Sequence, residues 1–349
     1  MINKGFFSKL KSKTKLIIFV SFTLTLLIGI LIGYILKGIL ADYEKPAPQH
    51  FEIRESGFKF INPLLECDTA RNAIENNELN PFKNKIESFI KNAFDKKRAD
   101  SISVYFRKLN DGPWFSIGPT ENFSPASLLK VPLMIAILKE AETNPKILTK
   151  KMKFEGIKDL TTVQRIRPSK TLGSRESYTV EELLYRMIVY SDNNAFYLLE
   201  DAVNSDIYKK TYDDMGIVNP YVVDEDDFIS AERYASFFRV LFNASYLNKE
   251  MSEKAMEYLA NAEFKDGLVA GVPSNIVVAH KFGEHKHMLG NNNEIYQLHD
   301  CGIIYYPNHP YLLCVMTKGN SFEYLVADIK EISRVVYEEI DRQYRNTNP

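Results

Sequence analysis

The chain has 349 residues, of which 45% are hydrophobic and 26% are charged, with 15 prolines, 16 glycines and three cysteines. These proportions exclude a collagen-like, a low-complexity and a disulfide-scaffold protein. The net charge is −1, but every charged side chain of residues 1–37 is a lysine, so the rest of the chain carries 38 basic and 45 acidic side chains. We expect no nucleic-acid partner, because no basic surface remains outside this leader.

The leader contains a long apolar run. Residues 16–36 are 21 uncharged positions rich in leucine and isoleucine, and a membrane-spanning helix needs about 20 such residues. Five lysines and no acidic residue precede the run, which favours a cytoplasmic tail over residues 1–15 and a single transmembrane helix over residues 16–37 in the cell membrane, with the rest of the chain extracytoplasmic. A cleaved signal peptide is the alternative, although its apolar region is usually shorter.

Two regions follow the leader. Residues 38–80 mix proline, charge and isolated apolar residues, which predicts an extracytoplasmic tether that ends in a short packed piece. Residues 81–349 have a length suited to one two-lobed domain. Inside it, apolar residues at helical spacing predict a helix over Phe82–Phe94, and alternation predicts strands over Ile102–Leu109 and Trp114–Ile117.

The next segment contains a serine and a lysine in apolar surroundings. Ser124 followed by Pro125 predicts the start of a helix, with the serine as its N-cap. The helix is apolar on nearly every face, so we expect it to be buried, with Ser127 and Lys130 on one side. Burial lowers the pKa of an ammonium group, and a lysine that loses its proton can serve as the base for a serine nucleophile. The bare Ser-x-x-Lys spacing occurs at three other serines, so the apolar context carries the hypothesis.

Two further polar clusters follow. A helix predicted from a capping box at Thr179 ends at residues 191–193, Ser-Asp-Asn, before a second apolar run. A buried strand predicted over residues 275–280 continues into residues 281–283, Lys-Phe-Gly, where the glycine permits close backbone approach. Taken singly, these patterns also fit a connecting turn and an ordinary strand end.

In this order, the three clusters resemble the Ser-x-x-Lys, Ser-Asp-Asn and Lys-Thr-Gly signatures of the serine β-lactamase and penicillin-binding protein superfamily. Their separations of 64 and 90 residues are similar to those of the class A β-lactamase branch. The resemblance implies an α/β fold of the α+β type, in which helices flank an antiparallel sheet and residues 140–265 add an all-α lobe. It also implies a monomeric serine hydrolase that needs neither metal nor cofactor and acts on a small-molecule β-lactam or a D-Ala-D-Ala peptide.

The resemblance assigns a role to each matching residue. Ser127 would be the acylated nucleophile, and Lys130 would accept its proton. Ser191 would relay a proton to the leaving nitrogen, with Lys281 supplying positive potential beside it. Asp192 would order the loop. The expected substrate contacts come from the side chain of Asn193, from Gly283, and from the backbone N–H of Glu284, which would form an oxyanion hole together with that of Ser127.

The chain departs from the family pattern where the substrate's carboxylate would bind. Phe282 replaces the hydroxyl residue of the third signature. Neither Asp300 nor Cys301 can replace the arginine that class A enzymes typically present on the neighbouring strand. Carboxylate recognition would then fall to other groups, such as Lys281 or a histidine.

A second departure concerns deacylation. Class A β-lactamases carry a loop glutamate that activates the hydrolytic water, and the matching loop here, residues 222–230, lacks that pattern. Glu225 or Asp226 could serve as the base, although a run of acids is also typical of a solvated loop. An acyl-enzyme without an efficient base persists. This outcome favours one alternative to a β-lactamase, a D-alanyl-D-alanine peptidase, while Phe282 favours the other, a catalytically idle wall-binding domain.

The histidines and cysteines complete the candidates. Cys301 and Cys314 fall on two adjacent predicted strands, where they either form a disulfide or remain buried thiols, and Cys67 stays unpaired. No metal-ligand spacing accompanies the histidines, so we expect no metal site. Four of them are close in sequence: His280, His285, His287 and His299.

Overall fold

The computed structural model describes residues 20–33, 52–67, 79–110, 112–289 and 293–345. The chain divides into two units, Met1–His50 and Phe51–Pro349. In the first unit, residues 20–33 are helical. Within the described ranges, no helix is both long enough and apolar enough to cross a membrane. The ends of the predicted span, residues 16–19 and 34–37, lie outside these ranges.

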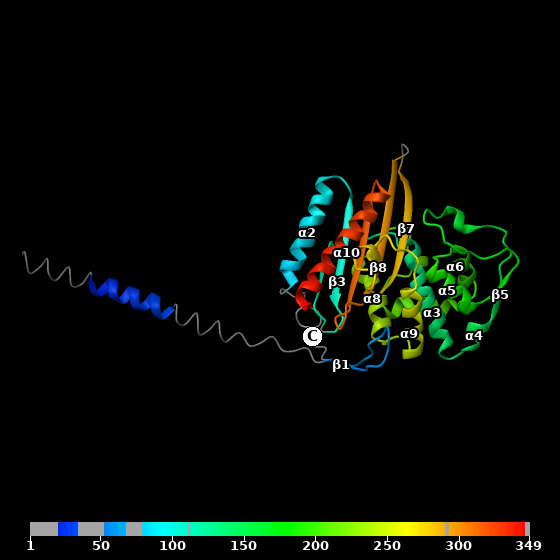
Figure 1. Cartoon of the computed structure of the whole chain (residues 1–349), viewed down its shortest axis with the longest axis horizontal. Coiled ribbons are helices and arrows are strands. Elements are labelled where there is room, and N and C mark those ends of the chain that lie inside the picture. Colours follow the sequence, from blue (N-terminus) through cyan, green and yellow to red (C-terminus); the bar gives the residue numbers. More distant parts are fainter. Residues whose placement is uncertain (1–19, 34–51, 68–78, 111, 290–292, 346–349) are drawn as a thin grey trace, which may run out of the picture. The chain divides into compact units, whose positions relative to one another are not determined.

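A five-stranded antiparallel sheet lies at the centre of the second unit, with the strand order β4-β3-β9-β8-β7 (Figure 1). Its side chains alternate between two cores, because successive residues of a strand point to opposite faces. On β3, for example, Val104 and Phe106 face one core and Tyr105 faces the other. The strands are β3 (Ser101–Lys108), β4 (Trp114–Ile117), β7 (Val278–Leu289), β8 (Asn293–Ile304) and β9 (Tyr311–Gly319).

Two helices, α2 (Asn80–Asp95) and α10 (Phe322–Tyr344), cover one face of the sheet (Figure 1). The Phe82 ring of α2 packs edge-on against the rings of Phe106 and Phe115, at centroid distances of 5.0 and 5.2 Å. Helix α10 presents the apolar stripe expected of a helix that is buried on one side. The stripe consists of Leu325, Ile329, Ile332, Val336 and Ile340.

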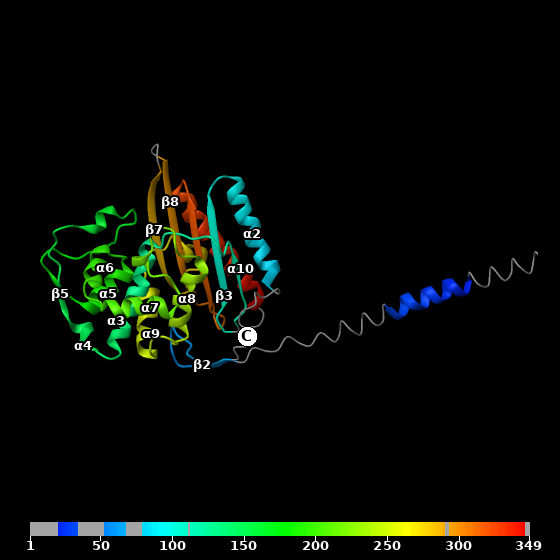
Figure 2. The same ribbon diagram turned by 180° about the vertical axis from the view of Figure 1, so that it is seen from behind.

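The lobe covers the opposite face, with α8 and α9 in contact with the sheet (Figure 2). At its centre lies α3, in which every residue from Lys130 to Leu138 is buried. The prediction of an all-α lobe is wrong, because β5 and β6 form a two-stranded sheet within it. On β5, only Met152 turns toward the core. A strand of three residues is too short to give a recognisable alternation. The elements of the lobe are α3 (Lys130–Ala141), α4 (Lys146–Thr149), β5 (Lys151–Lys153), β6 (Ser177–Thr179), α5 (Val180–Val189), α6 (Asn193–Glu200), α7 (Ser205–Asp214), α8 (Ala231–Phe242) and α9 (Lys249–Ala260).

Part of the predicted tether packs on the domain. Phe60 and Ile61 are buried in the lobe core, and the Glu253 carboxylate accepts hydrogen bonds from the backbone N–H groups of residues 59–61 at 2.9–3.1 Å. This segment therefore belongs to the same compact unit as the domain, Phe51–Pro349. The segment forms an antiparallel pair of short strands, β1 (Glu52–Arg54) and β2 (Leu64–Cys67).

The two cysteines near the C-terminus form a disulfide. Cys301 on β8 lies directly opposite Cys314 on β9, and both are fully buried. Of the two alternatives that the sequence left open, the disulfide is correct. The prediction for the Cys67 side chain lies outside what the structure describes.

Candidate active site

The candidate nucleophile lies in a 3₁₀ turn, η3 (Ala126–Leu129), directly before α3. The predicted helix start at Ser124 is wrong, because Ala126 adopts a φ of 47°, which no α-helix allows. In a 3₁₀ turn, side chains three residues apart are eclipsed. Ser127 and Lys130 therefore lie on one side, and the distance from Lys130 Nζ to Ser127 Oγ is 2.8 Å.

The environment of Lys130 Nζ leaves one position for a hydroxyl proton. The backbone oxygen of Ser191, at 2.9 Å, and Oδ1 of Asn193, at 2.7 Å, can only accept hydrogen bonds. The orientation of the Asn193 amide is supported by its Nδ2, which donates to the backbone oxygen of Leu160 at 3.3 Å. A neutral lysine amine has two N–H groups and one lone pair. With both N–H groups directed at these acceptors, the lone pair is free for a hydroxyl, and that of Ser127, at 2.8 Å, is nearer than that of Ser191, at 3.2 Å.

Burial favours the neutral amine. Burial lowers the pKa of Lys130 well below its usual value, and the nearby charge of Lys281 lowers it further, against the opposing influence of Asp192 and Glu284. Burial also lowers the pKa of Lys281, to about 7. Both lysines thus have access to their neutral forms much nearer to neutral pH than a lysine in water.

The second motif forms the connection between α5 and α6. Ser191 adopts a left-handed backbone conformation, with a φ of 58°. Its Oγ accepts a hydrogen bond from Lys281 Nζ at 2.9 Å and lies 3.2 Å from Lys130 Nζ. Asp192 caps α6, since its Oδ1 accepts from the backbone N–H of Asn194 at 2.8 Å. The loop therefore places one hydroxyl between two buried lysines.

The third motif lies on β7, an edge strand of the sheet that packs against η3. A Cβ atom at Gly283 would lie 2.7 Å from the backbone oxygen of Pro125 and 2.9 Å from Cγ of Leu128. Glycine is thus required for β7 to approach the turn that carries the nucleophile. This contact confirms the close approach predicted at Gly283.

Ser127 is half-buried and lines a cavity of about 420 Å³. Lys130 borders an adjoining hollow of about 290 Å³, which Ser127 and Asn193 also line. Together the two spaces join residues of the first two motifs with Glu284, which directly follows the third. The remaining residues that line the larger cavity are Val163, Gln164, Arg165, Glu284, His285, Lys286, Tyr296 and Phe322.

The sequence model of the β-lactamase enzyme family matches this chain over residues 83–340, well over half of the chain's length. The chain belongs to this family. The match confirms the predicted membership of the serine β-lactamase and penicillin-binding protein superfamily. No curated protein matches the chain.

Solved structures of the family share the fold. A class A β-lactamase from Bacteroides cellulosilyticus is 18% identical, with a TM-score of 0.62, over 75% of this chain and 99% of that one. The TLA-1 extended-spectrum β-lactamase is 18% identical, with a TM-score of 0.63, over 75% of this chain and 98% of that one. A mutant of PBP-A, in an acyl-enzyme complex with penicillin G, is 19% identical, with a TM-score of 0.62, over 76% of this chain and 97% of that one.

The structure explains both departures at the carboxylate position. Asp300 is buried, with Oδ1 2.7 Å from His280 Nδ1 and Oδ2 accepting from the backbone N–H of Leu268 at 2.8 Å. Phe282 is also buried, and its ring covers Lys281 Nζ at 4.1 Å. Both positions have become part of the core beneath the site. The basic side chains that line the larger cavity are instead those of Arg165 and Lys286, with His285 beside them.

Two contacts in the site had no signal in the sequence. Gln164 donates to the backbone oxygen of Ser191 at 3.0 Å and accepts from the backbone N–H of Asn193 at 3.4 Å, so it braces the second motif. The side chain of Glu284 accepts from the backbone N–H of Ile166 at 2.8 Å and holds the opposite wall. Burial raises the pKa of the Glu284 carboxyl group. Both contacts join segments far apart in sequence.

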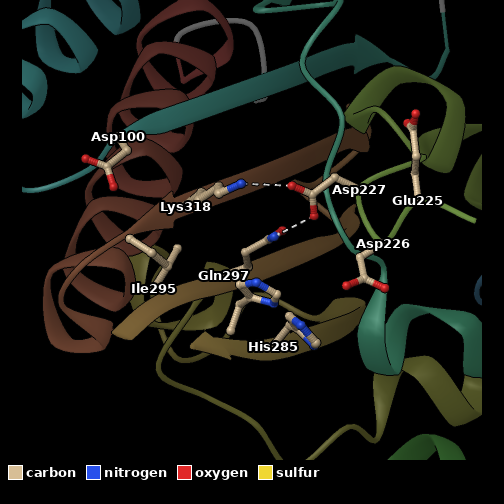
Figure 3. A pocket seen from close by; sticks show the side chains of 9 residues that line it. Asp100, Glu225, Asp226, Asp227, His285, Ile295, Gln297 and Lys318 are labelled. Atoms are coloured by element: carbon tan, nitrogen blue, oxygen red, sulfur yellow. Dashed lines mark hydrogen bonds and ion pairs between the residues drawn. The ribbon is translucent and has the colours of Figure 1, made fainter. Parts of the chain in front are cut away.

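The structure does not bring the candidate deacylation bases to Ser127. Glu225 and Asp226 line a different cavity of about 600 Å³ (Figure 3). Among the described residues, Glu284 is the only carboxylic acid that lines either cavity containing Ser127. The roles of Glu225 and Asp226 in deacylation therefore stay predictions without support from proximity.

Proposed function

We propose that this chain is a serine acyl hydrolase in which β-lactam amides acylate Ser127. The observation that carries the proposal is the 2.8 Å contact between Ser127 Oγ and the buried Lys130 Nζ. The two acceptors at Ser191 and Asn193 occupy the N–H groups of the amine and leave its lone pair to the serine. Family membership supports the same reaction, since the PBP-A mutant carries penicillin G as an acyl-enzyme.

Acylation begins with proton transfer from the Ser127 hydroxyl to Lys130 Nζ. Ser127 Oγ attacks the carbonyl carbon of the amide, and the carbonyl oxygen takes up negative charge. The backbone N–H groups of Ser127 and Glu284 are the proposed donors to this oxyanion. Donors of this kind typically contribute about 3–4 kcal/mol to transition-state stabilisation.

The tetrahedral intermediate then loses its amine. The C–N bond breaks, and the nitrogen takes a proton from Ser191 Oγ. Lys130, whose Nζ lies 3.2 Å from that oxygen, returns the proton it took from Ser127. Lys281, at 2.9 Å on the other side, stabilises the developing charge on Ser191. The products of this half-reaction are an ester on Ser127 and a neutral amine.

Water then cleaves the ester in a β-lactamase. The position of Glu225 and Asp226 in another cavity favours slow deacylation, since Glu284, the carboxylic acid near Ser127, is bonded to Ile166. This arrangement favours a second candidate function, a D-alanyl-D-alanine peptidase that acts on cell-wall peptides and traps β-lactams. The two functions share the acylation step and differ in the fate of the acyl-enzyme.

We also propose that residues 16–37 anchor the enzyme in the cell membrane, with its N-terminus in the cytoplasm. The apolar run and its five preceding lysines support this location. The Cys301–Cys314 disulfide supports an extracytoplasmic domain, because disulfides persist in oxidising compartments. Protease treatment of intact cells tests the topology. The added protease should degrade the domain, and complete protection of the domain would contradict the proposed topology.

The activity is tested on the full chain in detergent, with a chromogenic β-lactam and with a D-Ala-D-Ala peptide. Turnover and intact mass are recorded together. Fast β-lactam turnover identifies a β-lactamase, whereas a lasting adduct with peptide cleavage identifies the peptidase. No reaction with either compound overturns the proposal in favour of an idle binding domain.

Variants assign the residues. Ser127→Ala should abolish the adduct, and labelling that persists in this variant contradicts the assignment. Lys130→Met should slow acylation by about 10²- to 10⁴-fold, the usual contribution of a general base. Lys139→Met is the matched control on the same helix, because Lys139 bonds to Glu142 and to the backbone of Tyr246 away from the site.

A further inference from the structure

We propose that Asp226, His285 and His287 bind one divalent transition-metal ion of the zinc type. Their donor atoms all lie within 4.8 Å of one another. The two histidines are two residues apart on β7 and so project from the same face of the strand. Asp226 comes from the loop that precedes α8 and lies beside His285 in the cavity (Figure 3).

Within the described part of the chain, these three side chains have no other polar partner. Among the described residues, no hydrogen bond or ion pair involves any of them. The other two histidines of the sequence cluster differ, since His280 contacts Asp300 at 2.7 Å and His299 contacts the backbone oxygen of Ser124 at 2.9 Å, both fully buried. The unpaired histidines are thus the ones that face the cavity.

The neighbouring Asp227 holds the loop in place. Its carboxylate accepts from Gln297 Nε2 at 2.7 Å and pairs with Lys318 Nζ at 2.9 Å, on strands β8 and β9 (Figure 3). These contacts fix the backbone of the loop over the sheet. Asp226 is thereby kept close to the histidines without any bond of its own to them.

The donor set selects the ion. Two imidazole nitrogens and one carboxylate suit zinc and its neighbours, whereas magnesium and calcium prefer oxygen ligands. Zinc bonds of about 2.0–2.2 Å require the donors to come closer together. Asp226 and His287 are exposed and His285 is half-buried, so side-chain rotation can achieve this. Three protein ligands leave a fourth position open to water.

The expectation of no metal site rested on spacing along the chain. That spacing contains the histidine pair but not Asp226, which lies 59 residues before His285 and reaches it only through the fold. A bound ion would join the loop to the edge strand beside the catalytic cavity, because His285 lines both cavities. The site is independent of the proposed acylation and can exist whether or not that activity does.

The test measures binding of Zn²⁺ to the full chain in detergent after treatment with a chelator. Equilibrium dialysis should give one Zn²⁺ per chain, with Mg²⁺ bound at least tenfold more weakly. His287→Gln and Asp226→Asn should each weaken Zn²⁺ binding at least tenfold. The matched controls are Asp224→Asn in the same acidic loop and His309→Gln outside the cavity, and both should bind as the wild type does.

Two results would overturn the proposal. Equal binding by the wild type, His287→Gln and Asp226→Asn would place the ion elsewhere. An equal loss in Asp226→Asn and Asp224→Asn would reduce the effect to general attraction by the acidic loop. Circular dichroism of each variant shows whether it is folded. Bound Co²⁺ gives an independent readout, because its visible absorption bands should change in His285→Gln even if the affinity changes little.

Discussion

Replacing Lys281 by methionine should remove a pH dependence from the stability of the domain. In the folded chain, burial lowers the pKa of Lys281 from 10.5 to about 7. Between these two values the unfolded chain holds a proton that the folded chain has lost. The free energy of unfolding of the wild type therefore rises with pH through this window, by up to about 1.4 kcal/mol per pH unit.

The magnitude is large enough to measure. From pH 7.5 to 9.5, the wild type should gain about 2.5 kcal/mol of unfolding free energy relative to Lys281→Met. Well below pH 7, Lys281 is protonated in both states and its contribution no longer changes. The loss of its hydrogen bonds in the variant shifts the free energy by an amount that does not depend on this titration.

Urea denaturation of the full chain at pH 7.5, 8.5 and 9.5, followed by the fluorescence of its single tryptophan, provides the measurement. Lys139→Met serves as the control and should keep the pH slope of the wild type. Parallel slopes for the wild type and Lys281→Met would refute the reasoning. Ser191 would then face a permanently charged lysine, and the electrostatic account of the site would need revision.

Three further substitutions test the approach of β7 to the site, the contact of residues 59–61 with the lobe, and the role of the acidic loop. Gly283→Ala should slow acylation of Ser127 at least tenfold and lower the free energy of unfolding by about 1–3 kcal/mol. The reason is that the new Cβ atom would lie 2.7 Å from the backbone oxygen of Pro125. An unchanged acylation rate would show that β7 can shift freely. Glu253→Ala should speed amide exchange at residues 59–61 but leave acylation intact, since it removes their hydrogen-bond acceptor. Glu225→Gln should leave the deacylation rate of a β-lactam adduct within twofold of the wild type, and a tenfold decrease would identify Glu225 as the base after all.

The sequence predicted those elements whose pattern is local. The β3–β4 hairpin follows from alternation, and both of its strands lie within a few residues of the predicted bounds. Strand β7 extends beyond the predicted residues 275–283, because its pairing with β8 continues through polar residues to Leu289 and Asn293. A hydrophobic pattern indicates which residues of a strand are buried, whereas the hydrogen-bonded pairing of β7 with β8 continues beyond the buried residues.

The candidate site was predictable where an unusual residue type stood in an apolar context. A lysine in a buried helix and a lysine at the end of a buried strand are costly, so their presence in the sequence carried information. The contacts of Gln164, Glu284 and Asp226 were not predictable, because each residue acquires its neighbours from segments far away in the chain. The left-handed Ala126, which moves the start of α3, has no sequence signal either.

A second serine–lysine pair with the same spacing, Ser88 and Lys91, shows how much the burial of the lysine matters. Ser88 and Lys91 repeat the Ser-x-x-Lys spacing on α2, but Lys91 is 76% exposed and pairs with Asp95, and Ser88 Oγ donates to the backbone oxygen of Asn84. Lys130, at 1% exposure, has only uncharged oxygen atoms as hydrogen-bond partners among the described residues. Since spacing is equal and environment differs, a β-lactam or a reactive phosphonate should modify Ser127 and leave Ser88 unmodified in peptide mapping. Labelling of both serines would mean that spacing alone creates the reactivity, and that burial of the lysine has no part in it.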